Sequence, residues 1–248
     1  MSKSIIFIAD YFVNDVFGGA EIVDKEIIEG LEKNGYGVTK IKCADLTPQN
    51  LGDLANNKLD VLIGNFASMH PNAMEFIATN CRYSVIEHDH KYVQSRDVTN
   101  FKDCLVPPHM VINRKFYANA NRLFCQADSH AKLVSRNLGL KTINLSTSIW
   151  SDADLDIMEE HCSKPKNGKT MVLGSNNPIK NTKLAQSVCE ANGINYDTVG
   201  PLPYPELMSK MAEYTEVLFL PAFQESFNRF IVEAKMLGCR VKTNNRNG

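Results

Sequence analysis

The chain has 248 residues and a formal net charge of −1, with 44% hydrophobic and 22% charged residues. This balance is typical of a globular protein, and a chain of this length forms one large domain or two smaller ones. A net charge near zero gives no global field that attracts nucleic acid or anionic lipid, and no apolar run approaches the roughly 18 residues of a membrane span.

The N-terminus and the cysteines favour a cytoplasmic protein. The first apolar stretch, in MSKSIIFIADYF, is too short for a signal peptide and matches the pattern of a strand. The seven cysteines are odd in number, scattered and without a C-x-x-C pair. They therefore argue against a disulfide framework or a structural zinc site, and for a reducing compartment.

The first half of the chain alternates short β-branched runs with helical patterns. The expected strands are residues 4–9, 37–43, 59–65, 83–87, 121–126 and 142–146. A helix follows the first strand and ends at Asn34-Gly35, and another helix covers residues 128–139. The apolar face of the first helix consists of Ala20, Val23, Ile27 and Leu31.

The alternation pauses at a polar stretch, 151–168, which we expect to form a short acidic helix and a linker. Strands are then expected at 170–174, 195–200, 216–222 and 239–243, with helices at 181–193, 203–214 and 225–238. Strands that alternate with helices in this way form parallel β-α-β units. We therefore predict an α/β fold with two Rossmann-like parallel-sheet domains that face a cleft, residues 1–150 and 169–248, joined by the linker.

The expected helix at 225–238 carries two carboxylates on a largely apolar surface. Its core-facing stripe consists of Phe227, Phe230, Ile231, Ala234 and Leu237. Glu233 lies at the edge of this stripe, where a carboxylate needs hydrogen-bond donors because unpaired burial is costly. Glu225 lies at the start of the helix, where unpaired N–H groups and the helix dipole favour negative charge.

Two interpretations of these carboxylates are open. In the first, Glu225 is a simple helix-cap acid and Glu233 forms a core-edge salt bridge with Arg229 or Lys235. In the second, both carboxylates bind hydroxyl groups of a sugar nucleotide, whose diphosphate lies against the helix N-terminus.

The segment PAFQESFNRFIVEAKMLGCRV, residues 221–241, resembles the E-x7-E segment of GT-B glycosyltransferases of the family 4, or group 1, type. These are sugar-nucleotide-dependent enzymes with two Rossmann-like domains. The matching residues are Pro221, Glu225, Phe227, Glu233, Ala234, Gly238 and Val241. Asn228 replaces the usual small Gly of the pattern, and Arg240 replaces its Pro.

The resemblance extends to three other segments. FGGAE at 17–21 is similar to the family's Gly-Gly turn after the first strand. VLGSNNPIKN at 172–181 resembles the segment that opens the second domain, with Gly174 and Lys180 matching but without the usual arginine. Residues 199–222 resemble the stretch whose Gly-containing loop packs near the nucleobase.

The resemblance implies a donor site. Glu233 would contact the ribose, and Glu225 would hold the sugar and diphosphate together with the backbone amides of Ser226, Phe227 and Asn228. Lys180 would neutralise the diphosphate, and Gly18, Gly19 and Gly174 would line the site. A lysine is chemically suited to this task as a point-charge partner of phosphate.

Two histidines and two aspartates are considered as further catalytic or metal-binding residues. His88 lies just past the fourth strand, where family members often place a histidine that faces the reacting sugar; the alternative is a surface or loop-capping histidine. His88 and His90 point to opposite sides of an extended segment, which disfavours a shared metal. Asp152 and Asp154 form a D-x-D triplet, but at the start of an acidic helix, where the dipole favours them.

We therefore predict a glycosyltransferase that moves a sugar from a nucleoside-diphosphate sugar to an acceptor, with retention and without a cofactor or metal. The acceptor (sugar, lipid, protein or modified nucleic acid) stays open. A nicotinamide-dependent dehydrogenase would need G-x-G-x-x-G after the first strand, which is missing. A sugar-nucleotide epimerase on the same fold is another alternative.

A third alternative is a catalytically inactive or truncated GT-B-like protein with a binding or scaffold role. The missing arginine after Gly174 favours it. So does the end of the sequence at Gly248, soon after the last expected strand and without the family's usual C-terminal crossover helices.

Overall fold

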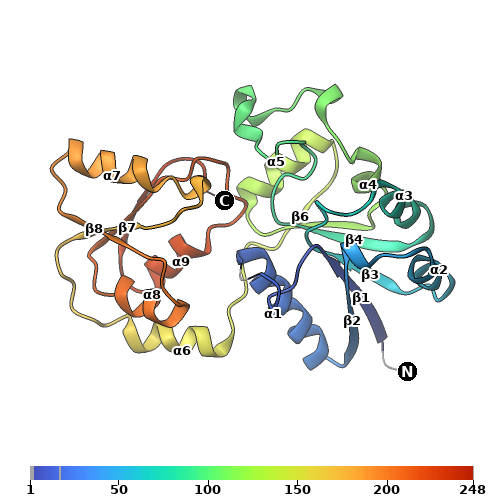
Figure 1. Cartoon of the computed structure of the whole chain (residues 1–248), viewed down its shortest axis with the longest axis horizontal. Coiled ribbons are helices and arrows are strands. Elements are labelled where there is room, and N and C mark those ends of the chain that lie inside the picture. The colour runs from blue at the N-terminus through green and yellow to red at the C-terminus, as the bar shows by residue number, and fades with distance from the viewer. Residues whose placement is uncertain (1–2, 17, 248) are drawn as a thin grey trace. The chain divides into compact units, whose positions relative to one another are not determined.

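The computed structural model describes residues 3–16 and 18–247 and divides into two compact units, Met1–Ile149 and Trp150–Gly248 (Figure 1). Both units are α/β, and both sheets are entirely parallel where their strands pair. The first sheet has six strands and the second has four. The predicted α/β architecture with two parallel sheets is therefore confirmed.

The first unit contains a doubly wound sheet with the strand order β2-β1-β3-β4-β5-β6. Its strands are β1 (Lys3–Ala9), β2 (Tyr36–Lys42), β3 (Asp60–Ile63), β4 (Arg82–Glu87), β5 (Arg122–Cys125) and β6 (Ile143–Asn144). The chain moves from β1 to β2 on one side and returns to β3 on the other. The order therefore reverses between β1 and β3, which is where sheets of this kind bind ligands, beyond the carboxyl ends of the strands.

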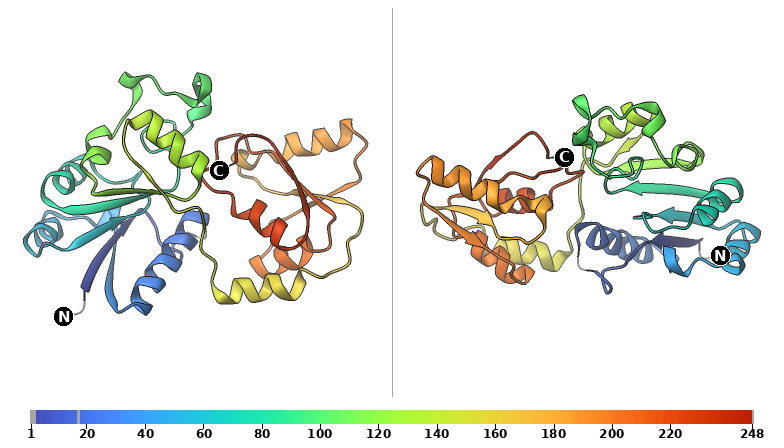
Figure 2. Two further views of the ribbon diagram at one scale, coloured as in Figure 1. Left: turned by 180° about the vertical axis from the view of Figure 1, so that it is seen from behind. Right: turned by 45° about the horizontal axis from the view of Figure 1, so that its top comes forward.

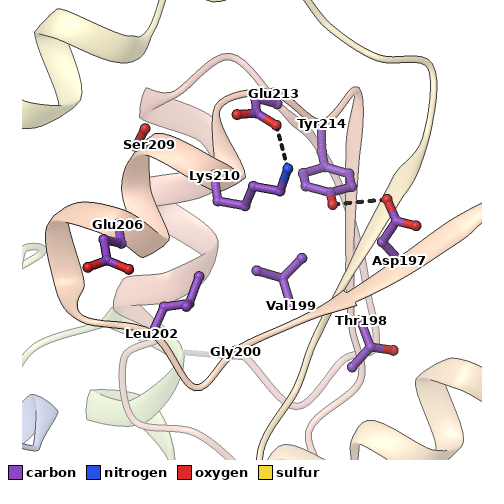
Figure 3. Close-up of a pocket in the computed structure, with 10 residues that line it drawn as sticks. All are labelled: Asp197, Thr198, Val199, Gly200, Leu202, Glu206, Ser209, Lys210, Glu213 and Tyr214. Carbon is purple, nitrogen blue, oxygen red and sulfur yellow. Dashed lines mark hydrogen bonds and ion pairs between the residues drawn. The ribbon is translucent and has the colours of Figure 1, made fainter.

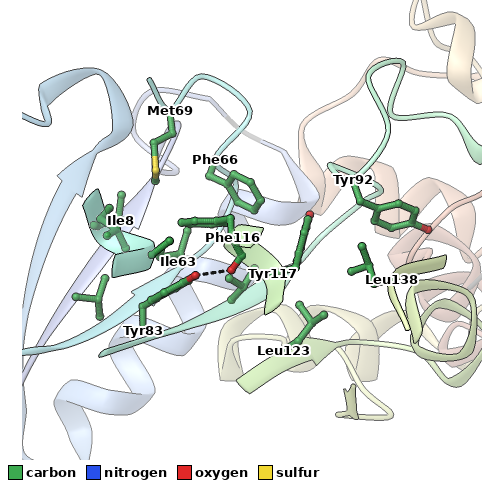
Figure 4. Packing of buried hydrophobic residues seen from close by; sticks show 14 of the residues in the cluster. Ile8, Ile63, Phe66, Met69, Tyr83, Tyr92, Phe116, Tyr117, Leu123 and Leu138 are labelled. Carbon is green, nitrogen blue, oxygen red and sulfur yellow. Dashed lines mark hydrogen bonds between the residues drawn. The ribbon is translucent and has the colours of Figure 1, made fainter. Parts of the chain in front are cut away.

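Helices cover both faces of this sheet (Figure 1). They are α1 (Gly19–Lys33), α2 (Pro48–Asn56), α3 (Pro71–Asn80), α4 (Arg114–Asn119) and α5 (Asp128–Leu138), with 3-10 turns at Cys43–Asp45, Val98–Asn100, Lys102–Cys104 and Pro108–Met110. Ile28 of α1 packs with Phe7, Ala9 and Ile86 on one face. The larger core on the other face includes Tyr83, Phe116, Tyr117 and Leu138, and the Tyr83 hydroxyl donates to the Phe116 carbonyl (Figure 4).

The prediction for the apolar face of α1 is partly wrong. Its buried residues are Glu21, Val23, Asp24 and Ile28, whereas Ala20, Ile27 and Leu31 are only half-buried. The helix is rotated from the expected stripe because two acidic side chains turn inward and find polar partners. Asp24 contacts His88, and Glu21 accepts a long hydrogen bond from the Asn65 side chain.

The second unit repeats the doubly wound arrangement with the strand order β10-β9-β7-β8. Its strands are β7 (Thr170–Leu173), β8 (Tyr196–Val199), β9 (Glu216–Phe219) and β10 (Arg240–Thr243). Its helices are α6 (Asp152–His161), α7 (Thr182–Ala191), α8 (Tyr204–Met211) and α9 (Arg229–Met236), with a 3-10 turn at Pro178–Lys180. Here the strand order reverses between β7 and β9.

Helix α7 packs on one face of this sheet, and α6, α8 and α9 pack on the other (Figures 1 and 2). Residues 152–161, expected as an acidic helix beside a linker, form α6, and Met158 is buried in the core with Met171 and Leu237. The Nζ atom of Lys166 donates to the carbonyls of Ala212 and Leu237 at 2.7 and 2.6 Å. This lysine therefore ties together the C-terminal ends of α8 and α9.

The expected helix at 225–238 begins four residues later than predicted. Helix α9 starts at Arg229, and the Oδ1 atom of Asn228 accepts a hydrogen bond from the Ile231 N–H at 3.1 Å. Asparagine is among the strongest N-cap residues, which explains the start. The prediction that Glu225 caps this helix, or lies at its N-terminus, is therefore wrong: its backbone N–H donates to the Arg246 carbonyl.

Among the described residues, no helix is both long and apolar enough to cross a membrane.

Candidate functional site

An ion pair joins the two loops at the reversal point of the second sheet. Lys180 ends the 3-10 turn after β7, and Glu225 lies in the loop after β9; Lys180 Nζ is 2.9 Å from Glu225 Oε1. The same loops are linked by the Ala222 N–H, which donates to the Ile179 carbonyl at 2.9 Å. Both ion-pair side chains are partly exposed, at 32% and 15%. A charged pair therefore occupies the edge where parallel α/β sheets bind their ligands.

A second carboxylate, Glu233 on α9, is held by one of its two oxygens. Its Oε1 atom accepts hydrogen bonds from Trp150 Nε1 at 2.9 Å and from the Tyr204 hydroxyl at 3.2 Å. Arg229 Nε is 3.5 Å from the same oxygen. Burial raises the pKa of Glu233, and although these donors lower it, the pKa stays above its ordinary value. The salt bridge to Arg229, one of the two interpretations from the sequence, is therefore present, whereas Lys235 is exposed.

The loop before α9 holds the other residues predicted around Glu225. Phe227 packs edge-on against Trp150, with ring centroids 6.3 Å apart. Ser226 lies between Phe227 and Glu225 in the loop. The side chain of Asn228 is buried and engaged as the helix cap. The backbone amides predicted to bind the diphosphate therefore belong to the loop before α9 and to its N-cap residue, not to the first turn of the helix.

Gly174 allows two loops to approach closely at the carboxyl ends of β7 and β8. A Cβ atom on Gly174 would lie 2.8 Å from the carbonyl oxygen of Gly200, which itself has φ +113°. A side chain at Gly174 would therefore push the two loops apart. The close packing of the two loops is enough to explain why this position is a glycine. The place of Gly174 in the donor site stays a prediction.

The second unit also contains an open cavity of about 600 Å³ between the edge strand β8 and helix α8 (Figure 3). Its walls carry one hydrogen bond and one ion pair: the Tyr214 hydroxyl donates to Asp197 at 3.0 Å, and Lys210 contacts Glu213 at 2.7 Å. Gly200, in the loop predicted to pack near the nucleobase, lines this cavity, but Lys180, Glu225 and Glu233 do not. It lies on the outer edge of the sheet, away from the reversal point between β7 and β9.

In the first unit, His88 forms a buried pair with Asp24. The Nε2 atom of His88 is 2.7 Å from Asp24 Oδ1, and the two side chains are 3% and 1% exposed. Burial lowers the pKa of His88, but the Asp24 carboxylate outweighs it, and the net pKa is raised. A Cβ atom on Gly64 would clash with the Asp24 carboxylate, so this glycine makes room for the pair. The alternative of a surface histidine is therefore wrong.

The residues beside His88 form a buried charge network. Lys91 Nζ lies 2.8 Å from Glu87 and 3.0 Å from Asp89, and it is 2% exposed. The Tyr117 hydroxyl donates to the other oxygen of Glu87. Burial lowers the pKa of Lys91, but the two carboxylates raise it overall, so the lysine is held in its charged form. The network fixes the two residues that flank His88 in sequence.

The predicted glycine turn precedes α1. Gly18 is the N-cap of the helix and Gly19 its first residue. A Cβ atom on Gly18 would clash with the Glu21 carboxylate, whereas no described atom lies within 4 Å of a Cβ built on Gly19. Phe17, which begins the predicted turn, lies outside the described residues. The space beside Gly19 is therefore open, and that beside Gly18 is filled by a carboxylate.

Within residues 3–16 and 18–247, no cluster of three or more His, Cys, Asp or Glu side chains could hold a metal ion. Asp152 and Asp154 lie in the first turn of α6, where the Ser151 hydroxyl accepts from the Asp154 N–H. His90 is buried, and its Nδ1 atom contacts the Tyr92 hydroxyl at 2.9 Å.

No protein-family model and no curated protein matches the sequence. The fold is nevertheless similar to that of an α-glucosyltransferase in complex with UDP-glucose and DNA containing an abasic site. The two are 12% identical, with a TM-score of 0.52, over 99% of this chain and 80% of that chain. It is also similar to Anabaena HepE in complex with UDP, at 14% identity and a TM-score of 0.58, over 99% of this chain and 81% of that one. The chain therefore has a GT-B-like fold.

Sequence reasoning missed the partners that hold the predicted residues. Asp24 was not singled out, although two acids three residues apart, Glu21 and Asp24, could have signalled a polar face on α1. Trp150 and Tyr204 gave no signal, because their contacts with Glu233 bridge distant parts of the chain.

Proposed function

We propose that the chain is a glycosyltransferase of the E-x7-E GT-B type, which transfers a sugar from a nucleoside-diphosphate sugar. The observation that carries this proposal is the Lys180–Glu225 pair, which joins the loops after β7 and β9 where the strand order reverses. The similar structures were both obtained with UDP or UDP-glucose, so a uridine nucleotide is the proposed donor.

The proposed roles follow from charge and position. Lys180 binds the donor diphosphate as a point charge and releases Glu225. The freed Glu225 then accepts hydrogen bonds from the sugar, and Glu233 accepts them from the ribose. Ser226, Phe227 and Asn228 contribute the loop that follows Glu225. Gly18, Gly19 and Gly174 are proposed to line the donor site, and His88 to contact the transferred sugar.

The proposed chemistry relies on positioning and electrostatics. The departing diphosphate gains negative charge, which Lys180 stabilises in a preorganised site. The proposal includes retention at the anomeric carbon and transfer without a bound metal. Addition of EDTA should therefore leave donor binding unchanged.

The acceptor is a sugar, a lipid, a protein or a modified nucleic acid. Some of the similar α-glucosyltransferase structures hold DNA that contains an HMU base. Such a DNA is therefore the first acceptor to assay, followed by saccharides and lipids.

A specific observation also favours a nucleotide-binding or scaffold protein without turnover. Lys180 and Glu225 form an ion pair with each other, so each charge has a partner of opposite sign within the protein. Turnover separates the two functions: a transferase slowly hydrolyses its donor even without an acceptor, whereas a scaffold only binds it.

A thermal-shift screen of UDP, GDP, ADP and their sugar conjugates, with Mg²⁺ and with EDTA, tests the proposal. A ligand that binds only the folded protein stabilises it by RT ln(1 + [L]/Kd), so a true donor raises the unfolding temperature. We expect one nucleotide family to do so in both conditions. No shift with any of these ligands on folded protein would exclude a sugar-nucleotide enzyme.

A further inference from the structure

The contacts of Glu233 are unevenly divided between its two oxygens. In the part of the chain that the structure describes, every hydrogen bond and ion contact of this carboxylate goes to Oε1. Trp150 and Tyr204 supply these hydrogen bonds from outside α9: Trp150 precedes α6, and Tyr204 begins α8. Three separate segments of the second unit therefore converge on one carboxylate oxygen.

We infer that Trp150 and Tyr204 are positioning residues, which hold Glu233 through Oε1 and so leave Oε2 to accept hydrogen bonds from ribose hydroxyls. The ribose contact in this inference rests on the proposed function, whereas the positioning of Glu233 by Trp150 and Tyr204 does not. An ionised carboxylate only accepts hydrogen bonds, and a ribose presents hydroxyl donors. Two fixed donors on one oxygen also restrict the carboxylate to one orientation, which reduces the entropy lost on binding.

The surroundings of Glu233 also control its charge. Burial raises the pKa, the donors Trp150 and Tyr204 and the Arg229 guanidinium lower it, and the nearby Asp154 carboxylate raises it again. Arg229 in turn stacks over Trp150, with its guanidinium carbon 4.5 Å from the ring centroid. Loss of either neutral donor should therefore raise the pKa of Glu233 further, so that this carboxylate takes up its proton at a higher pH.

Trp150 makes this inference directly measurable, because it is the only tryptophan in the chain. Its indole N–H donates to Glu233, so its fluorescence should change when this carboxylate takes up a proton. A pH titration of the emission, without nucleotide, then reports on Glu233. We expect one transition in the wild type and its loss in Glu233→Gln.

Tyr204→Phe removes the hydroxyl donor and keeps the ring. A hydrogen bond to a charged group corresponds to roughly one pH unit, so the transition should move up by about that amount. Tyr214→Phe is the matched control, because its hydroxyl donates to a different carboxylate, Asp197, in the same unit. The control should leave the transition in place. An unchanged transition in Tyr204→Phe, or its persistence in Glu233→Gln, would overturn the holding role.

The second measurement is UDP affinity by calorimetry at neutral pH. Tyr204→Phe and Trp150→Phe should weaken UDP binding about three- to tenfold, with a greater loss as the pH falls, whereas Tyr214→Phe should not. Equal affinity in all variants, with the fluorescence shift present, would overturn the ribose assignment alone. A wild type that binds no nucleotide would overturn the proposed function and that assignment together, while the fluorescence result still decides the holding contacts.

Discussion

Lys180 Nζ lies 2.9 Å from Glu225 Oε1, so the cation proposed for the diphosphate is paired with the carboxylate proposed for the sugar. The two loops that carry this pair follow β7 and β9, the neighbouring strands between which the strand order reverses. A diphosphate that binds here competes with Glu225 for the Lys180 ammonium group. The two residues should therefore respond differently to mutation.

Lys180→Ala removes the positive charge and should weaken UDP binding by about tenfold or more, since charge-assisted hydrogen bonds are worth about 1.5–3 kcal/mol. Glu225→Gln instead removes the competitor. It should preserve or tighten UDP binding while it abolishes donor hydrolysis. Calorimetry with UDP and an assay of UDP release from UDP-glucose measure the two effects.

Lys183→Ala is the control for this pair, because Lys183 is an exposed lysine on the next turn of the chain. It should bind UDP as the wild type does. Equal losses in Lys180→Ala and Lys183→Ala would indicate a general charge effect and would speak against a specific diphosphate contact.

Asp24→Asn should destabilise the first unit in a pH-dependent way. The pKa of His88 is raised in the folded protein, so its pairing with Asp24 contributes fully below the unfolded pKa of about 6.5 and is lost as the pH rises through the folded value. Breaking a buried pair costs about 3–5 kcal/mol. Thermal unfolding followed by circular dichroism should show a larger loss at pH 6 than at pH 8.5.

Asp60→Asn provides the comparison, because Asp60 pairs with Arg82 on the surface, where both side chains are more than half exposed. Its effect should stay below about 1 kcal/mol at both pH values. If Asp24→Asn lost the same stability at both pH values, His88 would not be charged in the folded protein.

Gly174→Ala should destabilise the second unit, because the new methyl group would meet the Gly200 carbonyl oxygen at 2.8 Å. Overpacking of this kind costs about 1–3 kcal/mol. Gly19→Ala is the counterpart in the first unit, where the space is open, and it should leave stability unchanged or slightly higher. A drop in UDP affinity for Gly19→Ala without a stability change would support a phosphate contact at this turn.

Lys91→Met should unfold the first unit more readily than any surface change. It leaves the buried Glu87 carboxylate without its lysine, and it leaves the half-buried Asp89 with Arg96 as its remaining cation, at a cost of about 3–5 kcal/mol. The double variant Glu87→Gln/Lys91→Met removes one of those charges and should recover part of the loss. Urea unfolding of the three proteins measures it. Equal stability of wild type and Lys91→Met would mean that the network is not important for folding.

The strand order was predictable because each strand has its own local pattern, whereas no range was predicted for α2, α3 or α4 of the first unit. The four strands of the second unit all fall within the ranges expected from their β-branched runs. The start of α9 was not predictable from the apolar stripe. Phe227 fits the stripe, but it lies in a loop, where it packs against Trp150. The N-cap preference of Asn228 was the signal that could have corrected it.

The Glu233–Arg229 pair, four positions apart on one helix, was predictable, but the long-range polar contacts of the site were not. Trp150 and Glu233 are 83 positions apart, and Asp24 and His88 are 64 apart. Periodicity reports which face of an element is buried, but it does not report which buried polar groups meet. The motif resemblance suggested Glu233 and Lys180 as donor-site residues, but it carried no information about their long-range contacts.

The most direct test of the proposed donor site is a calorimetric titration of the wild-type protein with UDP in the presence of EDTA. We expect saturable binding of one UDP per chain, which is weakened in both Lys180→Ala and Glu233→Gln. No detectable binding of UDP, GDP or ADP by protein that shows a cooperative unfolding transition would contradict it.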